Sequence, residues 1–221
     1  TTAAAQADAY NNVPHVGHAH PRIAAAAADQ IARVNTNTRY LYDGLTDYAQ
    51  KLCSTLPREL DTCFFVNSGS EANELAVRIA KTVTGNQDML VVEGAYHGHT
   101  EAMINISPYK FMGKGGKGRP EPWVHVVPLA DGYRGLYKGQ TQETGTAYGD
   151  EVGKIIEKMD RPIAGFITES LLSCGGQVIP PKNYFKTAFA HVRAAGGLCI
   201  ADEVQTGFGR TGSCFWAFEL Q

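Results

Sequence analysis

Short apolar runs alternate along this chain with segments in which apolar residues recur at helical spacing. An apolar run of about 4–8 residues bounded by turn formers is typical of a strand buried on both faces of a parallel sheet. On this basis we expect strands over residues 63–66, 89–92, 124–127, 163–168 and 198–201.

Amphipathic spacing and capping residues predict helices between these strands. Pro21 stands in the first turn of one helix and Gly85 closes another, as is common at helix starts and ends. We expect helices over residues 21–34, 46–56, 70–84, 97–106, 150–159 and 183–195, and turns over 128–148. The repeated alternation predicts an α/β fold with a mostly parallel sheet flanked by helices.

Charge, hydropathy and cysteine content indicate which partners and which cellular compartment to expect. The 221 residues carry a formal net charge of −2, which gives no reason to expect nucleic acid or an anionic membrane as a partner. No apolar run approaches the ~20 residues that span a bilayer. The five cysteines lack C-x-x-C spacing and are expected to be reduced thiols, so we expect an intracellular protein, cytoplasmic or of the mitochondrial matrix.

Residues that carry chemistry follow the predicted strand over 198–201. Asp202 stands at its carboxyl end, where ligands bind in open α/β sheets. A charge there is costly unless it is paired, so we expect Asp202 to face a cation; a helix N-cap or an ordinary salt bridge is the alternative. Gly207, Gly209 and Gly212 fit a dinucleotide fingerprint. Five residues separate them from the strand, and aromatic residues follow, so we reject that motif.

A Ser-Gly-Ser turn leads from the strand over 63–66 into the next helix. Ser68, Gly69 and Ser70 lie where the positive end of that helix and its unpaired N–H groups converge, which predicts an anion site. Gly69 would let a ligand approach the backbone closely. An ordinary serine N-cap with Glu71 nearby is the alternative.

Tyr96 and Glu169 follow two further strands. The ring of Tyr96 is suited to lie over a planar ligand, and Glu169 ends its strand as Asp202 does. His97 and His99 are two residues apart and do not share a helix face, and the histidines within 15–20 lack a carboxylate or cysteine, so we expect no metal site.

One kind of ligand would satisfy the anion site, the aromatic ring and the two acids together: a phosphate joined to a flat ring with a basic nitrogen. Pyridoxal 5'-phosphate has these parts. A carboxylate beside the pyridine nitrogen keeps it protonated and makes the ring an electron sink. We therefore expect this cofactor.

Three motifs carry a resemblance to a known family: Asn67-Ser68-Gly69-Ser70-Glu71-Ala72-Asn73, Tyr96-His97-Gly98 and Asp202-Glu203-Val204-Gln205-Thr206-Gly207-Phe208-Gly209-Arg210-Thr211-Gly212. From residue 17 to the end the sequence resembles the class III (omega-type) aminotransferases, which are fold-type-I pyridoxal-phosphate enzymes. The resemblance implies a cofactor-binding set of Ser68, Gly69, Ser70, Tyr96, His97, Asp202 and Gln205.

Individual roles are also implied by the resemblance. Residues 68–70 would hold the cofactor phosphate, and Tyr96 would stack on the pyridine ring. Asp202 would pair with the ring nitrogen, and Gln205 would bond the phenolic oxygen. Glu169 would position the amine substrate.

Within the family, one departure favours a particular branch. Ser-Leu-Leu-Ser-Cys-Gly-Gly-Gln follows Glu169, where the family usually has proline and then Gln-Gly. With the segments 35–40 and 106–110, this looks like the phospho-lyases that act on ethanolamine phosphate and 5-phosphohydroxylysine. We favour that branch, and a transaminase remains the alternative.

A second departure concerns the family's Schiff-base lysine, which should lie beyond Asp202 on a stretch that this chain does not contain. We expect residues 1–44 to be a remnant of the small domain with a connecting helix, and 45–221 to be part of the cofactor-binding large domain, which would not turn over alone. A non-catalytic binding module is the alternative. The resemblance also implies a homodimer with its active site at the interface.

Overall fold

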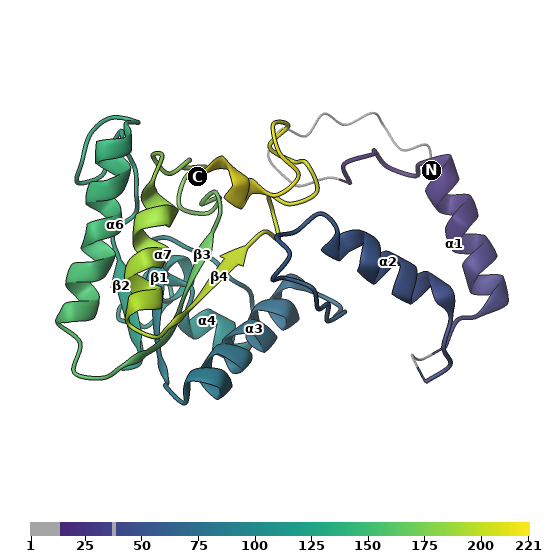
Figure 1. Ribbon diagram of the computed structural model, residues 1–221, viewed down its shortest axis with the longest axis horizontal. Helices are drawn as coiled ribbons and strands as arrows, with labels where there is room; N and C mark the ends of the chain where they lie inside the picture. The colour runs from purple at the N-terminus through teal and green to yellow at the C-terminus, as the bar shows by residue number, and fades with distance from the viewer. Residues whose placement is uncertain (1–13, 37–38) are drawn as a thin grey trace. The chain divides into compact units, whose positions relative to one another are not determined.

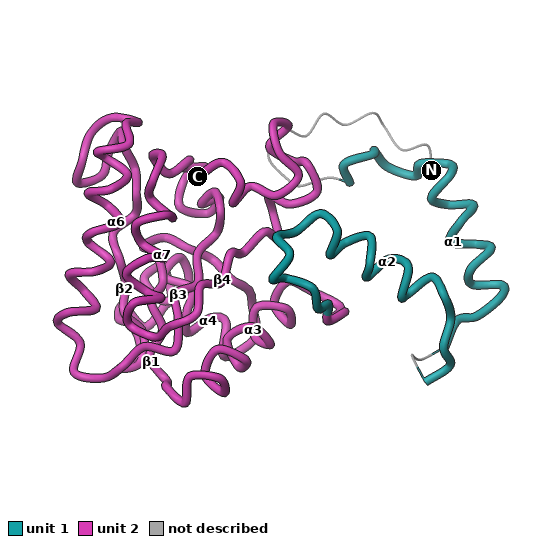
Figure 2. The backbone as a smooth tube through the Cα atoms, in the orientation of Figure 1, with its two compact units in different colours: residues 1–63 teal, residues 64–221 magenta. Residues whose placement is uncertain are grey.

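The computed structural model describes residues 14–36 and 39–221 and falls into two compact units, Thr1–Cys63 and Phe64–Gln221 (Figure 2). The predicted segment 1–44 therefore belongs to the first unit, and its residues 1–13 and 37–38 lie outside the described part. The expected domain boundary after residue 44 stays a prediction. No helix of the described residues combines the length and the apolar character needed to cross a membrane.

The described part of the first unit contains two helices, α1 (Pro21–Arg33) and α2 (Asp43–Cys53). Pro21 occupies the first turn of α1 as predicted. The second helix begins earlier than its expected start at Thr46, with Asp43 in its first turn, where a negative charge interacts favourably with the helix dipole. None of the described residues in either helix is buried, so this unit has little core of its own.

The second unit is built on a parallel sheet of four strands in the order β2-β1-β3-β4 (Figure 1). These strands confirm four of the five predicted ones, and the α/β class with them. Their bounds are β1 (Asp88–Val92), β2 (Val124–Val127), β3 (Ile163–Glu169) and β4 (Leu198–Asp202). All residues of β1 and β3 are buried, as expected for interior strands of a parallel sheet.

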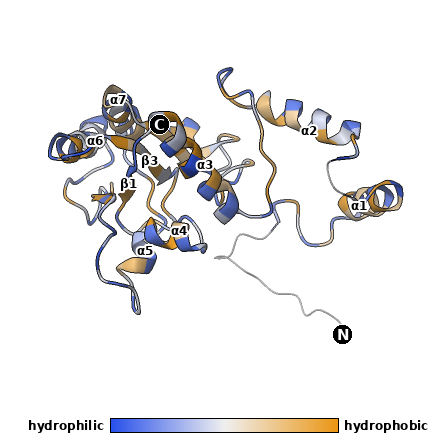
Figure 3. Cartoon of the chain, turned by 90° about the horizontal axis from the view of Figure 1, so that it is seen from below, coloured by the Kyte–Doolittle hydropathy of each residue, from blue (hydrophilic) through white to orange (hydrophobic). Residues whose placement is uncertain are grey.

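Helices cover both faces of this sheet. They are α3 (Gly69–Thr84), α4 (Glu101–Asn105), α5 (Pro108–Phe111), α6 (Gln142–Glu157) and α7 (Tyr184–Ala194), followed by the short 3-10 helix η1 (Ala217–Leu220). Figure 3 shows β1 and β3 between α6 and α7 on one side and α3 on the other.

Two hydrophobic cores follow from the alternation of side chains along β1. Leu90 and Val92 belong to the core that includes residues of α6 and α7. Met89 and Val91 belong to the core on the opposite face, with residues of α3 and α4. Successive side chains of a strand point to opposite faces, so a continuous apolar run buries both.

Two predictions of local structure were wrong. Residues 63–66 form no strand in the described structure, and Phe64 is 65% exposed, because an apolar run becomes a strand only when a neighbour takes up its backbone hydrogen bonds. The helix expected from His97 begins only at Glu101. The N–H of His97 instead donates to Ser107 Oγ at 2.9 Å, and Thr100 is the N-cap.

The helix expected over 150–159 begins at Gln142, within the segment expected to be turns. Thr141 is its N-cap, accepting a hydrogen bond from the N–H of Thr144 at 3.2 Å. Glycines made the segment look turn-rich. Gly145 belongs to that segment and lies inside α6, where a Cβ would clash with the backbone of Pro181 and Lys182, so packing explains this glycine and not a turn.

Candidate active site

The carboxyl ends of β3 and β4, the loop after β1 and the start of α3 surround a pocket of about 140 Å³. Of the predicted site residues, all but Ser68 line it, namely Gly69, Ser70, Tyr96, His97, Glu169, Asp202 and Gln205. The topology explains why they meet, since the carboxyl ends of parallel strands lie at one edge of the sheet.

Glu169 and Asp202 are directly paired across β3 and β4. Their exposed fractions are only 4% and 6%, so both carboxyl groups lie out of water at the floor of the pocket. Buried carboxylates need hydrogen bonds or opposite charge to remain ionised. The two acids obtain these partners from different parts of the chain.

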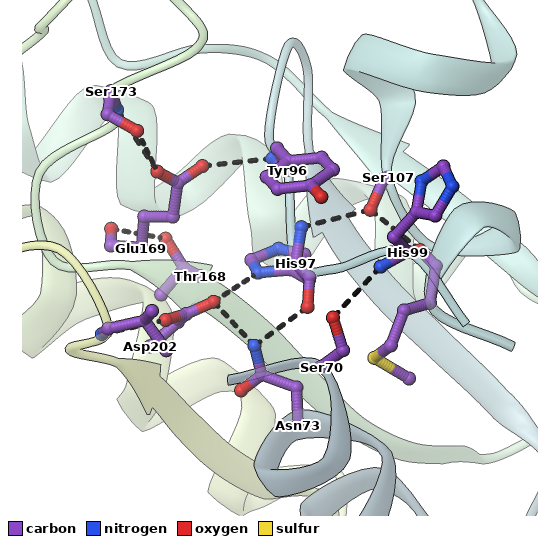
Figure 4. A network of polar contacts seen from close by, with 12 residues as sticks. Ser70, Asn73, Tyr96, His97, His99, Ser107, Thr168, Glu169, Ser173 and Asp202 are labelled. Atoms are coloured by element: carbon purple, nitrogen blue, oxygen red, sulfur yellow. Dashed lines mark hydrogen bonds and ion pairs between the residues drawn. The ribbon is translucent and has the colours of Figure 1, made fainter. Parts of the chain in front are cut away.

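Among the described residues, Asp202 has three hydrogen-bond partners, of which Asn73 and His97 are labelled in Figure 4. Its Oδ2 accepts a hydrogen bond from Asn73 Nδ2 at 2.7 Å and lies 2.8 Å from His97 Nδ1. Its Oδ1 accepts one from the N–H of Val204 at 3.0 Å. The bond to Val204 is of the kind that a capping side chain makes, but a turn follows Asp202 and not the helix considered as an alternative above. Among the described residues no lysine or arginine forms a salt bridge with Asp202.

Asn73 is a site residue for which the sequence suggested no role. Besides Asp202, its Nδ2 donates to the carbonyl oxygen of His97 at 2.9 Å, and the side chain is buried. It lies one helical turn after Ser70, and residues three apart share a helix face. That spacing was the available signal.

The ring of His97 is fully buried between these groups. Its contact with Asp202 places the proton on Nδ1, and its Nε2 has no hydrogen-bond partner among the described residues. A buried polar atom without a partner costs roughly 1–3 kcal/mol. Such an atom beside a buried carboxylate is typical of a site that binds a further polar group.

The loop after β1 is fastened to the start of α3. The N–H of His99 donates to Ser70 Oγ at 3.0 Å. Gly98 has φ 138°, and a Cβ there would lie 2.5 Å from Ser70 Oγ, so only glycine fits. Ser68 acts as the N-cap of α3, with its Oγ accepting from the N–H of Glu71 at 3.2 Å, as in the alternative considered above.

Glu169 holds the opposite side of the same loop. Its Oε1 accepts a hydrogen bond from the N–H of Tyr96 at 2.9 Å. Its Oε2 accepts from the N–H and Oγ of Ser173 at 3.1 and 2.8 Å. These bonds fix the backbone at Tyr96, whose ring borders the pocket (Figure 4).

Glu203 also has a role that the sequence did not reveal. It accepts hydrogen bonds from Ser170 Oγ and Thr206 Oγ1, the latter at 3.1 Å, and from the N–H groups of Ala217 and Phe218 at 2.9 and 2.8 Å. The loop after β4 is thereby joined to η1 and to the end of β3. Its position directly after Asp202 was the only hint.

Across residues 14–36 and 39–221, no group of three or more His, Cys, Asp or Glu side chains is placed to hold a metal ion. The site instead combines a helix start, an aromatic ring and a buried carboxylate, which suits an organic ligand with an anionic end.

Comparison with known proteins decides the family. Residues 8–220 match the family model for aminotransferase class III. The chain belongs to the class III aminotransferases. The resemblance inferred from the three motifs is thereby confirmed.

Two relatives show how far the likeness extends. An alanine–glyoxylate aminotransferase 2-like protein of Drosophila melanogaster is 48% identical over 220 residues, covering 97% of this chain and 44% of the relative. Ethanolamine-phosphate phospho-lyase homolog 1 of Caenorhabditis elegans is 46% identical, covering 96% and 48%. The chain spans about half the length of the curated relatives it matches.

Solved structures of a phospholyase and of a transaminase are also similar to this chain. A phospholyase from Arthrobacter in complex with phosphoethanolamine has a TM-score of 0.84 at 37% identity, covering 96% of this chain and 50% of that one. An (S)-enantioselective omega-transaminase from Thermomicrobium roseum has a TM-score of 0.79 at 30% identity, covering 93% and 48%.

Proposed function

We propose that this chain supplies much of the cofactor site of a pyridoxal-phosphate-dependent class III enzyme that acts on a primary amine. The observation that carries the proposal is the buried Asp202 carboxylate, held by Asn73, His97 and Val204 at the end of β4. Such a fixed, buried anion suits a pyridinium nitrogen.

The other residues fit the same cofactor. Gly69 and Ser70 open the 16-residue helix α3 beside the pocket, where its positive end favours a phosphate. Tyr96 offers an aromatic face for the pyridine ring, and Gln205 lines the pocket where an amide can bond a ring oxygen. When bound, pyridoxal phosphate supplies an electron sink for bonds broken at the amine carbon.

Each protein group then has a defined task. Asp202 keeps a proton on the ring nitrogen, because the ionised carboxylate favours the cationic form of its partner. Asn73 and His97 keep that carboxylate in one orientation. Glu169 holds the backbone at Tyr96 and so sets the height of the aromatic ring above the floor of the pocket.

Among possible reactions, we favour phospho-lyase elimination over transamination. The loop after Glu169 departs from the usual aminotransferase pattern, and the Arthrobacter phospholyase has a TM-score of 0.84 against 0.79 for the transaminase. Transamination is the second candidate, because the Drosophila relative carries an aminotransferase name.

A single pair of assays on the intact enzyme separates the two reactions. Release of inorganic phosphate from ethanolamine phosphate supports the lyase, and transfer of an amino group to pyruvate supports the transaminase. Absence of both activities, or absence of visible absorbance from bound cofactor, would refute the proposal.

Three features of the whole enzyme are proposed from the family alone. The Schiff-base lysine, the homodimer and the interfacial active site are implied by the family, and the chain alone is expected to be inactive. A cytoplasmic or mitochondrial location is proposed on the same basis; the human relative at 39% identity is mitochondrial by name. A non-catalytic module would bind the cofactor, if at all, without forming a covalent bond.

A further inference from the structure

Lys110 projects from α5, a short helix that is tied to the pocket. The N–H of Tyr109 donates to the carbonyl oxygen of Ala95 at 3.0 Å, and Ser107 Oγ accepts from the N–H of His97. The Nζ of Lys110 lies 5.5 Å from the ring centroid of Tyr96 and 5.4 Å from that of Tyr109. A cation is therefore held beside the aromatic ring that borders the site.

This cation has no carboxylate partner. Among the described residues, none lies within salt-bridge distance of Lys110, whereas Lys117 and Lys154 are paired with Glu121 and Glu151. The lysine is also exposed, so its ammonium group can accept a ligand from solvent.

The pocket itself lacks a positive side chain of fixed charge. Its lining includes the carboxyl groups of Glu169 and Asp202 and, among the described residues, no lysine or arginine. An anionic group on the substrate would be repelled by these acids unless a cation stood at the entrance.

The positive charge of Lys110 also acts on Cys174, in the loop after Glu169. Burial raises the pKa of the Cys174 thiol, and the charge of Glu169 raises it further, whereas a hydrogen bond from Ser173 and the positive charge of Lys110 lower it. Cys174 belongs to the Ser-Leu-Leu-Ser-Cys segment that departs from the usual aminotransferase pattern. Lys110 thus lies next to the part of the site in which this branch differs.

We propose that Lys110 binds the phosphate group of a phosphorylated primary amine at the mouth of the pocket. This inference rests on the proposed function in its phospho-lyase form. A phosphate monoester carries about −1.5 to −2 charge at pH 7 and three strong acceptor oxygens, which match an unpaired ammonium group. An amine substrate without a phosphate or other anionic group would not need a positive side chain at this position.

The kinetic test compares Lys110→Gln with Lys158→Gln in the intact enzyme. Lys158 lies at the C-terminal cap of α6 and serves as a matched loss of one lysine charge. Lys110→Gln should raise KM for ethanolamine phosphate roughly 10-fold with little change in kcat, since it removes one charge-assisted hydrogen bond. Lys110→Arg should restore most of the loss, because guanidinium also binds phosphate.

A second test follows Cys174 and does not depend on turnover. The rate of its alkylation by iodoacetamide is measured by peptide mass spectrometry, with ethanolamine phosphate, inorganic phosphate or ethanolamine added. Ethanolamine phosphate should slow the reaction at the same concentrations in the wild type and in Lys158→Gln, and should need a roughly 10-fold higher concentration to do so in Lys110→Gln. Inorganic phosphate should protect more weakly, and ethanolamine not at all.

The outcomes separate this inference from the proposed function. If the wild type releases phosphate and Lys110→Gln matches Lys158→Gln in KM and in protection of Cys174, the role of Lys110 is wrong and the lyase assignment stands. If the wild type releases no phosphate from ethanolamine phosphate although it holds its cofactor, the lyase assignment is wrong, and the inference falls with it.

Discussion

Replacing Asn73 with alanine removes two hydrogen bonds from the floor of the pocket. The bond from Nδ2 to the Asp202 carboxylate is 2.7 Å long, and a bond to a buried charged group contributes about 1.5–3 kcal/mol. The bond to the carbonyl oxygen of His97 is 2.9 Å long and contributes about 0.5–1.5 kcal/mol. Asn73→Ala should therefore lower the free energy of unfolding of the Phe64–Gln221 unit by about 2–4.5 kcal/mol.

Urea unfolding followed by tryptophan fluorescence measures this loss. The two tryptophans, Trp123 and Trp216, lie in the Phe64–Gln221 unit, so the signal reports on that unit. For a slope of about 2 kcal/mol per molar urea, the midpoint should fall by about 1–2 M.

Asn86→Ala provides the matched control. Asn86 Nδ2 donates one hydrogen bond to the carbonyl oxygen of Ile163 at 2.9 Å, with no charged partner, so its loss should cost about 1 kcal/mol. A double-mutant cycle with Asp202→Asn should reveal coupling between Asn73 and Asp202. Equal destabilisation by Asn73→Ala and Asn86→Ala, or additive effects in the cycle, would show that the bond between Asn73 and the Asp202 carboxylate does not contribute this stability.

Three further predictions follow from particular contacts. Gly98→Ala should lower the free energy of unfolding by about 1–3 kcal/mol, because φ is 138° and the new Cβ would lie 2.5 Å from Ser70 Oγ; a loss below about 0.5 kcal/mol in urea would contradict this. The hydrogen bond from the N–H of Tyr133 lowers the pKa of Asp131, so the ionised carboxylate stabilises the folded state above its unfolded pKa, and this contribution is lost as the pH falls through the lower folded pKa. As the pH is lowered below about 4, the free energy of unfolding should therefore fall less in Asp131→Asn than in the wild type. Parallel curves of unfolding free energy against pH for the two proteins would contradict this. Burial raises the pKa of Cys199 to about 11, so at pH 8 its alkylation should be roughly 100-fold or more slower than that of a free thiol; comparable rates would argue against that environment.

The strands were predictable where a continuous apolar run is buried on both faces. The run over 89–92 places alternate residues in two cores, so its pattern determines its structure. The run over 63–66 is also continuously apolar and forms no strand, because pairing depends on a neighbouring strand that an apolar run does not reveal. The start of α6 was missed because Gly145, which packs inside the helix against the backbone of Lys182, resembles a turn former.

The site was predictable as far as topology determines it. Glu169 and Asp202 both end strands, and the parallel register brings them side by side. Asn73 and Asp202 are 129 positions apart, and nothing in their local sequence shows that their side chains meet. The roles of Asn73 and Glu203 depend on such contacts between distant segments, so only the structure reveals them.

The protonation state of the cofactor nitrogen shows whether Asp202 is the partner of a pyridinium. In the intact enzyme loaded with pyridoxal phosphate labelled with ¹⁵N in the ring, the nitrogen chemical shift distinguishes a pyridinium from a neutral pyridine. We expect a pyridinium shift in the wild type near pH 8 and a neutral pyridine shift in Asp202→Ala. The same shift in both proteins would show that Asp202 does not hold the proton on the ring.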